Sequence, residues 1–184
     1  MAFECRRGII ALMSDLKSLM LGTPRWSVAV AESLTSGRLQ SAIGAVSGAS
    51  EYFAGGITTY NLDQKVRHLG VDRATAEAVN CVSEEVAREM ALGVCRLFRT
   101  TFGVSTTGYA EPWFAAGIRA PFAWWAIAQA RENGPAAILR VGRIECADMS
   151  RIQAQATVAE AVLAELIAAV AQARRASEAP DAEG

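Results

Sequence analysis

A cluster of hydroxyl side chains follows the first strand-like run of the chain. Residues 26–31 are apolar and rich in valine, and they lead into Glu-Ser-Leu-Thr-Ser-Gly at positions 32–37. Free backbone N–H groups at a strand-to-helix turn can hold an anion or a developing oxyanion. Serine and threonine also cap helices, so Ser33, Thr35 and Ser36 by themselves fit either a helix start or a nucleophilic site.

A second turn adds a phenol and an amine. The segment Thr58 to Lys65 places Tyr60 at the end of a strand-like run and Lys65 in the first turns of the following helix. An amine at this point could act as a base, but most lysines on helices face solvent. A buried Lys65 would be a candidate for chemistry, and an exposed one would not.

Alternating strands and helices must position these turns. Runs rich in β-branched and aromatic residues predict strands, and apolar residues at three- and four-residue steps predict helices. Glu132-Asn133-Gly134-Pro135 predicts an antiparallel turn between the last two strands. The expected strands are 26–31, 55–60, 102–107, 122–128 and 136–144, and the expected helices are 3–21, one after Gly37, one from Asn61 through His68, Ser83–Arg99 and 150–173.

This order predicts an α/β protein, a three-layer α/β/α sandwich with a mixed sheet in a single domain. We expect the domain to span residues 1–175 and to be followed by a flexible tail, 176–184. In such folds ligands bind at the strand-to-helix turns.

Composition excludes several classes of protein. The 184 residues are 52% hydrophobic and 20% charged, with a net charge of −1 and no dense Lys/Arg cluster, so we expect no nucleic-acid partner. Asp15 and Lys17 interrupt the first apolar stretch, which argues against export and membrane insertion. Four cysteines without a C-x-x-C pair and a single histidine, His68, disfavour a metal site. We expect a cytoplasmic protein with reduced cysteines and no cofactor.

Several ordered segments together resemble one family. Ala31–Gly37 and Thr59–Lys65 are similar to its Ala-Glu-Ser-x-Thr-x-Gly and Thr-Tyr-x-x-x-x-Lys motifs, with further matches at Val46–Phe53, Leu69–Val71, Val82–Ser83 and Thr107–Ala110. On these motifs the chain resembles the CinA C-terminal domain, of the nicotinamide-nucleotide amidohydrolase type. The likeness runs from about residue 26 to the last helix.

The resemblance implies roles for individual residues. Ser33 would be the nucleophile, Lys65 its general base, and Tyr60 a neighbour that orients or stabilises the site. The pairing is chemically coherent, because a serine needs a base to attack an amide and the chain lacks a second candidate for a Ser-His-Asp triad. The substrate-binding candidates are Glu32, Thr35, Ser36, Gly37, Thr107, Gly108, Tyr109 and Trp113. The expected partner is a small amide or nucleotide, and assembly into a homo-oligomer is left open.

One loop departs from the family pattern. The family's Gly-x-Ala-Gly-Pro-x-Gly-Gly corresponds to residues 108–115, where Glu111, Phe114 and Ala115 replace glycines. These side chains should reshape or fill the pocket, and Glu111 should repel a phosphate unless a cation intervenes. The family's later Gly-Asp-Arg motif is also altered, and Arg151 lies two positions away from the expected place. We therefore expect a basic contact to be missing.

Three hypotheses follow. The first is hydrolysis of nicotinamide mononucleotide to nicotinate mononucleotide and ammonia. The second is the same chemistry on another, unphosphorylated, small amide, and the third is a paralogue that binds a ligand or partner without turnover. Retention of Ser33, Tyr60 and Lys65 favours an enzyme, whereas the altered loop favours the second hypothesis over the first.

Overall fold

A five-stranded mixed sheet forms the centre of the protein. The computed structural model describes residues 15–131 and 133–178. The strands are β1 (Val28–Glu32), β2 (Phe53–Thr58), β3 (Phe102–Tyr109), β4 (Phe122–Arg131) and β5 (Gly134–Glu145). Their order is β2-β1-β3-β4-β5; β1 runs parallel to β2 and β3, while β3, β4 and β5 are antiparallel. The predicted mixed sheet and closing hairpin are confirmed.

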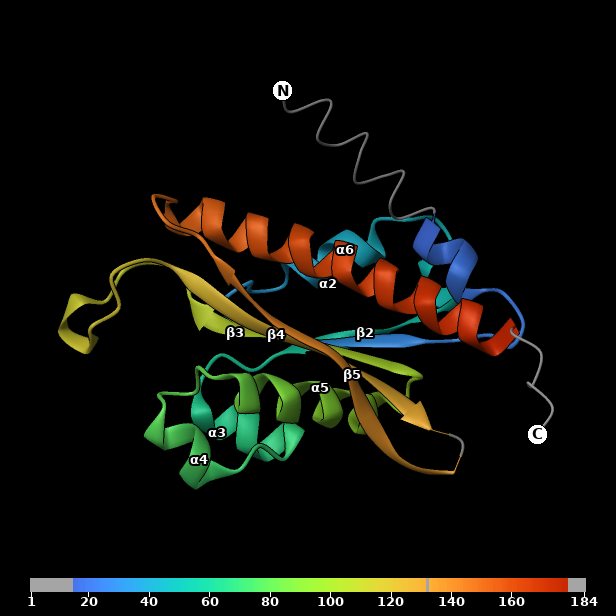
Figure 1. The fold of residues 1–184 in the computed structure, drawn as a ribbon, viewed down its shortest axis with the longest axis horizontal. Coiled ribbons are helices and arrows are strands. Elements are labelled where there is room, and N and C mark those ends of the chain that lie inside the picture. Colours follow the sequence, from blue (N-terminus) through green and yellow to red (C-terminus); the bar gives the residue numbers. More distant parts are fainter. Residues whose placement is uncertain (1–14, 132, 179–184) are drawn as a thin grey trace.

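Helices cover both faces of this sheet (Figure 1). One face carries α2 (Arg38–Gly44) and α6 (Arg151–Glu178), and the other carries α3 (Leu62–Gln64), α4 (Arg73–Ala78) and α5 (Glu84–Phe98). Short helical turns are η1 (Ala49–Glu51), the π-helical η2 (Lys65–Leu69) and η3 (Phe114–Ala116). The three-layer sandwich is thus confirmed.

The composition of β1 follows from its place between the two helical layers. Successive strand residues point to opposite faces. Val28 and Val30 belong to the core beneath α2 and α6, whereas Ala29 and Ala31 belong to the core with α5. All four are fully buried. The small alanines leave room for α5 to approach the sheet closely.

Helix α5 begins and ends where its sequence predicts. The Ser83 hydroxyl accepts a hydrogen bond from the Val86 N–H at 3.2 Å, two glutamates occupy the first turn, and Arg99 ends the helix in the left-handed conformation. A side-chain acceptor satisfies one of the free N–H groups at a helix start, and acidic residues there complement the helix dipole.

The structure differs from the sequence expectations in several segments, among them β2, which ends at Thr58 and so leaves Tyr60 outside the strand expected over 55–60. Helix α4 was not predicted, β3 continues two residues beyond 107, and α6 continues to Glu178 into the segment expected to be a tail. At the N-terminus residues 15–20 are helical, while the rest of the helix expected over 3–21, Cys5 and residues 179–184 lie outside the described part of the chain. Cys81, Cys95 and Cys146 are free thiols, as expected, and only the last two are buried.

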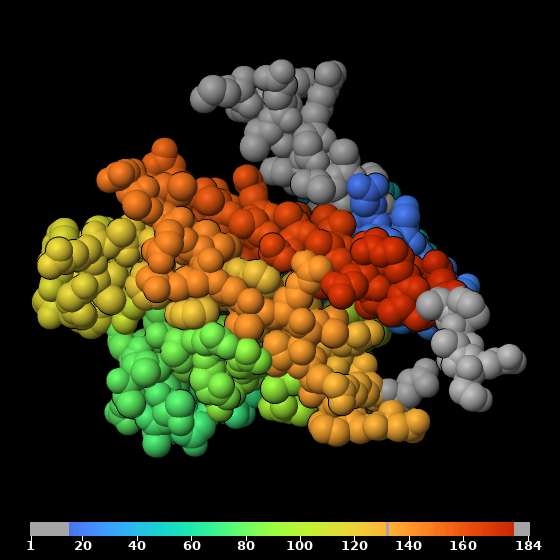
Figure 2. All heavy atoms as spheres, in the orientation of Figure 1, coloured from blue at the N-terminus to red at the C-terminus, as the bar shows by residue number. Residues whose placement is uncertain are grey.

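Helix α6 is long and apolar enough to cross a membrane by length and composition, and it is the one such helix among the described residues. It lies along one face of the sheet (Figure 1), and its outer side forms part of the surface of the molecule (Figure 2). Val158, Val162, Leu166 and Val170 are fully buried against the core. Packing as a core helix therefore accounts for its apolar residues.

Gly93 controls how closely α5 approaches the lysine-bearing turn. A Cβ atom at Gly93 would overlap the carbonyl oxygen of Leu69, the last residue of η2. We expect Gly93→Ala to lower the free energy of unfolding by about 1–3 kcal/mol through overpacking. The same change should also reduce any activity that depends on Lys65, because η2 must shift.

Gly44 offers the matched control, since it also lies in a helix. A Cβ atom there would meet nothing nearer than the Phe53 ring, at 4.0 Å. Gly44→Ala should leave stability unchanged or raise it by about 0.5–1 kcal/mol. Urea unfolding of both variants measures the difference, and equal stabilities would show that α5 can move away from η2 without cost.

Candidate functional site

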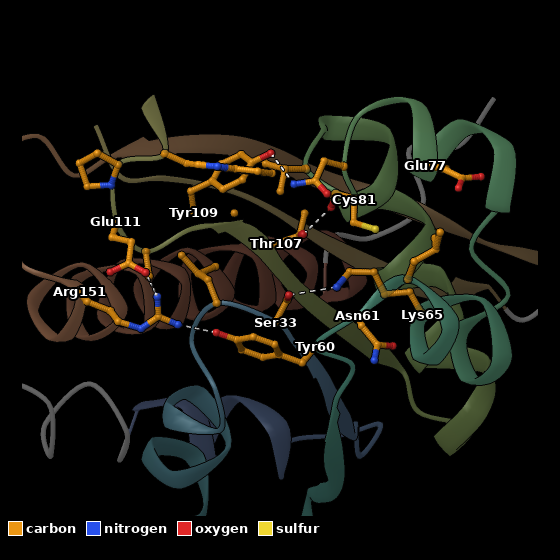
Figure 3. A pocket seen from close by; sticks show the side chains of 18 residues that line it. Ser33, Tyr60, Asn61, Lys65, Glu77, Cys81, Thr107, Tyr109, Glu111 and Arg151 are labelled. Carbon is orange, nitrogen blue, oxygen red and sulfur yellow. Dashed lines mark hydrogen bonds and ion pairs between the residues drawn. The ribbon is translucent and has the colours of Figure 1, made fainter. Parts of the chain in front are cut away.

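The predicted site residues lie where three parallel strands end. Ser33 directly follows β1, Tyr60 is the second residue after β2, and Thr107 to Tyr109 form the end of β3. Because β1 is parallel to both neighbours, the three carboxyl ends share one edge of the sheet. A cavity of about 610 Å³ opens there (Figure 3). Seven of the eleven predicted site residues line it: Ser33, Tyr60, Lys65, Thr107, Gly108, Tyr109 and Trp113.

Ser33 and Lys65 are in direct contact. The Lys65 Nζ lies 3.0 Å from the Ser33 Oγ and donates to the Thr59 carbonyl oxygen at 2.7 Å. Lys65 is 1% exposed and Ser33 is 7% exposed. The amine is therefore held by two partners at the inner end of the cavity, and it is not a solvated helix residue.

Burial changes the proton affinity of this amine. Removal from water disfavours the ammonium form and lowers the pKa of Lys65 to about 8, with a small opposing effect from the neighbouring Cys81. A substantial fraction of Lys65 is then neutral near physiological pH. In that form Nζ can accept the proton that Ser33 donates, while its own N–H still donates to Thr59.

Activity should follow this titration. If Lys65 must be neutral to act as a base, kcat/KM should rise by about tenfold per pH unit below pH 8 and level off above it. A profile from about pH 6 to 10 measures this dependence. An inflection near the ordinary pKa of lysine would mean that the reacting amine is exposed to water.

The free energy of unfolding, measured without substrate, should also depend on the protonation of Lys65. The folded-state pKa of Lys65 is below its ordinary value of 10.5, so between about pH 8 and 10.5 the unfolded chain binds more protons. The free energy of unfolding should therefore rise with pH in this window, and Lys65→Met should remove that rise. An unchanged slope in Lys65→Met would contradict the shifted pKa.

Four predicted substrate contacts instead support the turn. The buried Glu32 carboxylate accepts hydrogen bonds from the Gly37, Leu39 and Gln40 N–H groups at 2.9–3.1 Å. Thr35 is buried against Thr106, with their hydroxyl oxygens 2.8 Å apart. Ser36 and Gly37 have φ angles of 52° and 92°, which turn the chain into α2. None of the four lines the cavity, so we assign them to holding Ser33 in place.

Tyr60 faces the mouth of the cavity and contacts an arginine. Its hydroxyl accepts a 2.6 Å hydrogen bond from Arg151 Nη2, and the side chain is 53% exposed. Arg151 Nη1 in turn donates to Glu111 Oε1 at 2.7 Å (Figure 3). Among the described interactions, Tyr60 has no hydrogen bond to Ser33 or Lys65. The expectation that a basic contact is missing is wrong, because the start of α6 brings Arg151 to the cavity.

Aromatic rings form another part of the cavity wall. The centroids of the Tyr109 and Trp113 rings are 6.1 Å apart, and Tyr109 also packs edge-on against Phe122 at 5.5 Å. The Tyr109 hydroxyl accepts a 3.0 Å hydrogen bond from Asn80. This contact joins the end of β3 to the turn that follows α4.

Sequence reasoning missed the contribution of α4. Glu77, Asn80 and Cys81, from this helix and the turn after it, line the cavity. The Cys81 carbonyl accepts a hydrogen bond from Thr107 Oγ1 at 2.7 Å. The signal was present in Asp72-Arg-Ala-Thr75, since the Asp72 carboxylate caps α4 by accepting from the Thr75 N–H. An aspartate at this position before a run of helix-forming residues is typical of a helix start.

The family follows from comparison with known proteins. The sequence model of the CinA C-terminal domain family matches residues 11–172 of this chain. The chain belongs to this family. A CinA-like protein of Chlorobium limicola is 52% identical over 93 residues, which are 50% of this chain and 22% of the relative. A CinA-like protein of Desulforapulum autotrophicum is 48% identical over 86 residues, 47% of this chain and 20% of the relative. The matched segments are thus less than a quarter of these longer relatives.

Solved structures share the fold over most of the chain. A CinA superfamily protein from Enterobacter cloacae has a TM-score of 0.78 at 23% identity, covering 88% of this chain and 92% of the other. A competence/damage inducible protein from Agrobacterium tumefaciens has a TM-score of 0.71 at 27% identity, with the same two coverages. These likenesses agree with the three-layer sandwich described above.

Proposed function

We propose that this protein hydrolyses a small carboxamide, with Ser33 as nucleophile and Lys65 as general base. The observation that carries the proposal is the 3.0 Å contact between a buried serine hydroxyl and a buried amine whose pKa is lowered to about 8. A nucleophile beside a base that is partly neutral at working pH is the arrangement that acyl transfer requires.

The reaction proceeds through an acyl-enzyme. Neutral Lys65 Nζ takes the proton of Ser33 Oγ as the oxygen attacks the carboxamide carbon. The resulting ammonium returns a proton to the leaving nitrogen, the C–N bond breaks and ammonia departs. Water then attacks the ester carbon with Lys65 again accepting a proton, which passes back to Ser33 as the acid is released. Thr59 holds Nζ through both stages by accepting its N–H at 2.7 Å.

The substrate that the family resemblance suggests is nicotinamide mononucleotide, which would yield nicotinate mononucleotide and ammonia. The cavity of about 610 Å³ is within the usual range for small-molecule sites. The aromatic wall of Tyr109 and Trp113 can pack against a planar ring. Another small amide with the same reacting group is the second candidate.

An ammonia-release assay tests this function. Wild-type protein is incubated with nicotinamide mononucleotide and with a panel of small aromatic and aliphatic amides, and Ser33→Ala purified in the same way controls for contaminating amidases. We expect ammonia release from at least one amide by the wild type alone. Release at equal rates from both preparations, or from neither, would contradict the proposal and favour a binding protein without turnover.

A further inference from the structure

The ion pair between Glu111 and Arg151 occupies the mouth of the cavity. Glu111 lies in the loop after β3, and Arg151 is the first residue of α6. Figure 3 shows their side chains turned toward each other beside Tyr60. Arg151 Nη1 donates to Glu111 and Nη2 donates to Tyr60. The guanidinium thus has a carboxylate and a phenol as partners within the protein itself.

Among the described residues of the cavity wall, Arg151 carries the one positive charge that remains when Lys65 is neutral. The charged side chains of that wall are Lys65, Glu77, Glu111 and Arg151. Lys65 must lose its proton to act as a base. In the reacting form, the cavity wall then carries two carboxylates and one guanidinium, a formal net charge of −1.

We propose that Glu111 biases substrate choice against phosphate, so that the site prefers an uncharged or cationic aromatic carboxamide without a phosphate group. This inference rests on the proposed function and names its substrate class. An anionic group approaching Arg151 would have to displace Glu111 or lie beside it, and either arrangement places like charges close together. A positively charged planar ring instead meets an overall negative cavity and the faces of Tyr109 and Trp113.

The exposure of the pair limits the size of the effect. The Arg151 and Glu111 side chains are 41% and 61% exposed, so solvent and salt screen their charges. We therefore expect phosphate to be disfavoured by about tenfold rather than excluded completely.

Two amides that differ only by the phosphate test the proposal: nicotinamide riboside and nicotinamide mononucleotide. Wild-type kcat/KM should favour the riboside by about tenfold, and Glu111→Gln should reduce that preference to about threefold or less. Raising the salt from about 0.05 to 0.5 M should narrow the preference in the wild type but not in Glu111→Gln. The matched control is Glu77→Gln, which removes an equal charge from the same cavity away from Arg151, and it should leave the ratio within about 1.5-fold of the wild-type value.

The outcomes separate this inference from the function on which it rests. Preference for the mononucleotide, or a ratio unchanged in Glu111→Gln, overturns the role of Glu111 while leaving amide hydrolysis intact. A change of equal size in the kcat/KM ratio of Glu77→Gln would also overturn the inference. The total charge of the cavity, and not the pairing of Glu111 with Arg151, would then determine the substrate preference. If neither compound releases ammonia, calorimetric binding of both to the wild type and Glu111→Gln measures the same ratio without turnover. Equal binding of the two compounds, or no binding of either, would overturn the inference.

Discussion

Replacing Ser33 with alanine should lower kcat for amide hydrolysis by about 1,000-fold or more, and Lys65→Ala should have an effect of similar size. The serine supplies the oxygen that forms the acyl bond, and the lysine removes its proton across the 3.0 Å contact. Because the two groups act as one unit, the double variant should lose little more than either single variant. Single-turnover kinetics with an amide that the wild type hydrolyses measures all three.

Two variants control for indirect effects. Lys65→Arg keeps a positive charge but removes the base, since arginine is not deprotonated in proteins, and it should be as inactive as Lys65→Ala. Ser36→Gly removes a hydroxyl from the same turn without backbone strain, because Ser36 already has a φ of 52°. It should retain activity within about threefold of the wild type. Activity near the wild-type level in Ser33→Ala would exclude serine catalysis.

Replacing Glu32 with alanine should lower the free energy of unfolding by about 3 kcal/mol or more. The buried carboxylate accepts three backbone N–H groups at the start of α2, at 2.9–3.1 Å. Alanine leaves these donors without an acceptor and opens a cavity next to β1. Chemical denaturation at neutral pH measures the loss, and hydrolysis should fall as well, because the displaced turn carries Ser33.

The controls separate burial from charge. Glu32→Gln keeps an oxygen acceptor and nearly the same volume, so it should lose less stability than alanine. Glu165→Ala removes a partly exposed carboxylate, paired with Arg140 at 2.9 Å, and should cost less than about 1 kcal/mol. A loss below about 1 kcal/mol in Glu32→Ala would show that water satisfies the freed N–H groups.

Local patterns were enough to predict most of the elements. The caps and apolar stripe of α5, the Asn-Gly turn between β4 and β5, and the β-branched runs of β1 to β3 act over a few residues, so the chain itself records them. The turn that carries Ser33 and the turn that carries Tyr60 and Lys65 were also predicted to follow strands, and both do. Once the strands are parallel, these ends must lie at one edge of the sheet, which agrees with the pairing of Ser33 and Lys65 that the resemblance to the CinA C-terminal domain implies.

The sequence by itself therefore determined the layer architecture, and its resemblance to the CinA C-terminal domain pointed to the two groups that meet. Only the tertiary structure decided what surrounds them. Burial of Lys65, which lowers its pKa, depends on packing from several elements, and the inward turn of Glu32 depends on α2 folding over its carboxylate. Arg151 reaches Glu111 across 40 positions of sequence and Tyr60 across 91. Such contacts leave no periodicity in the chain, because they arise where separate elements pack together rather than within any one of them.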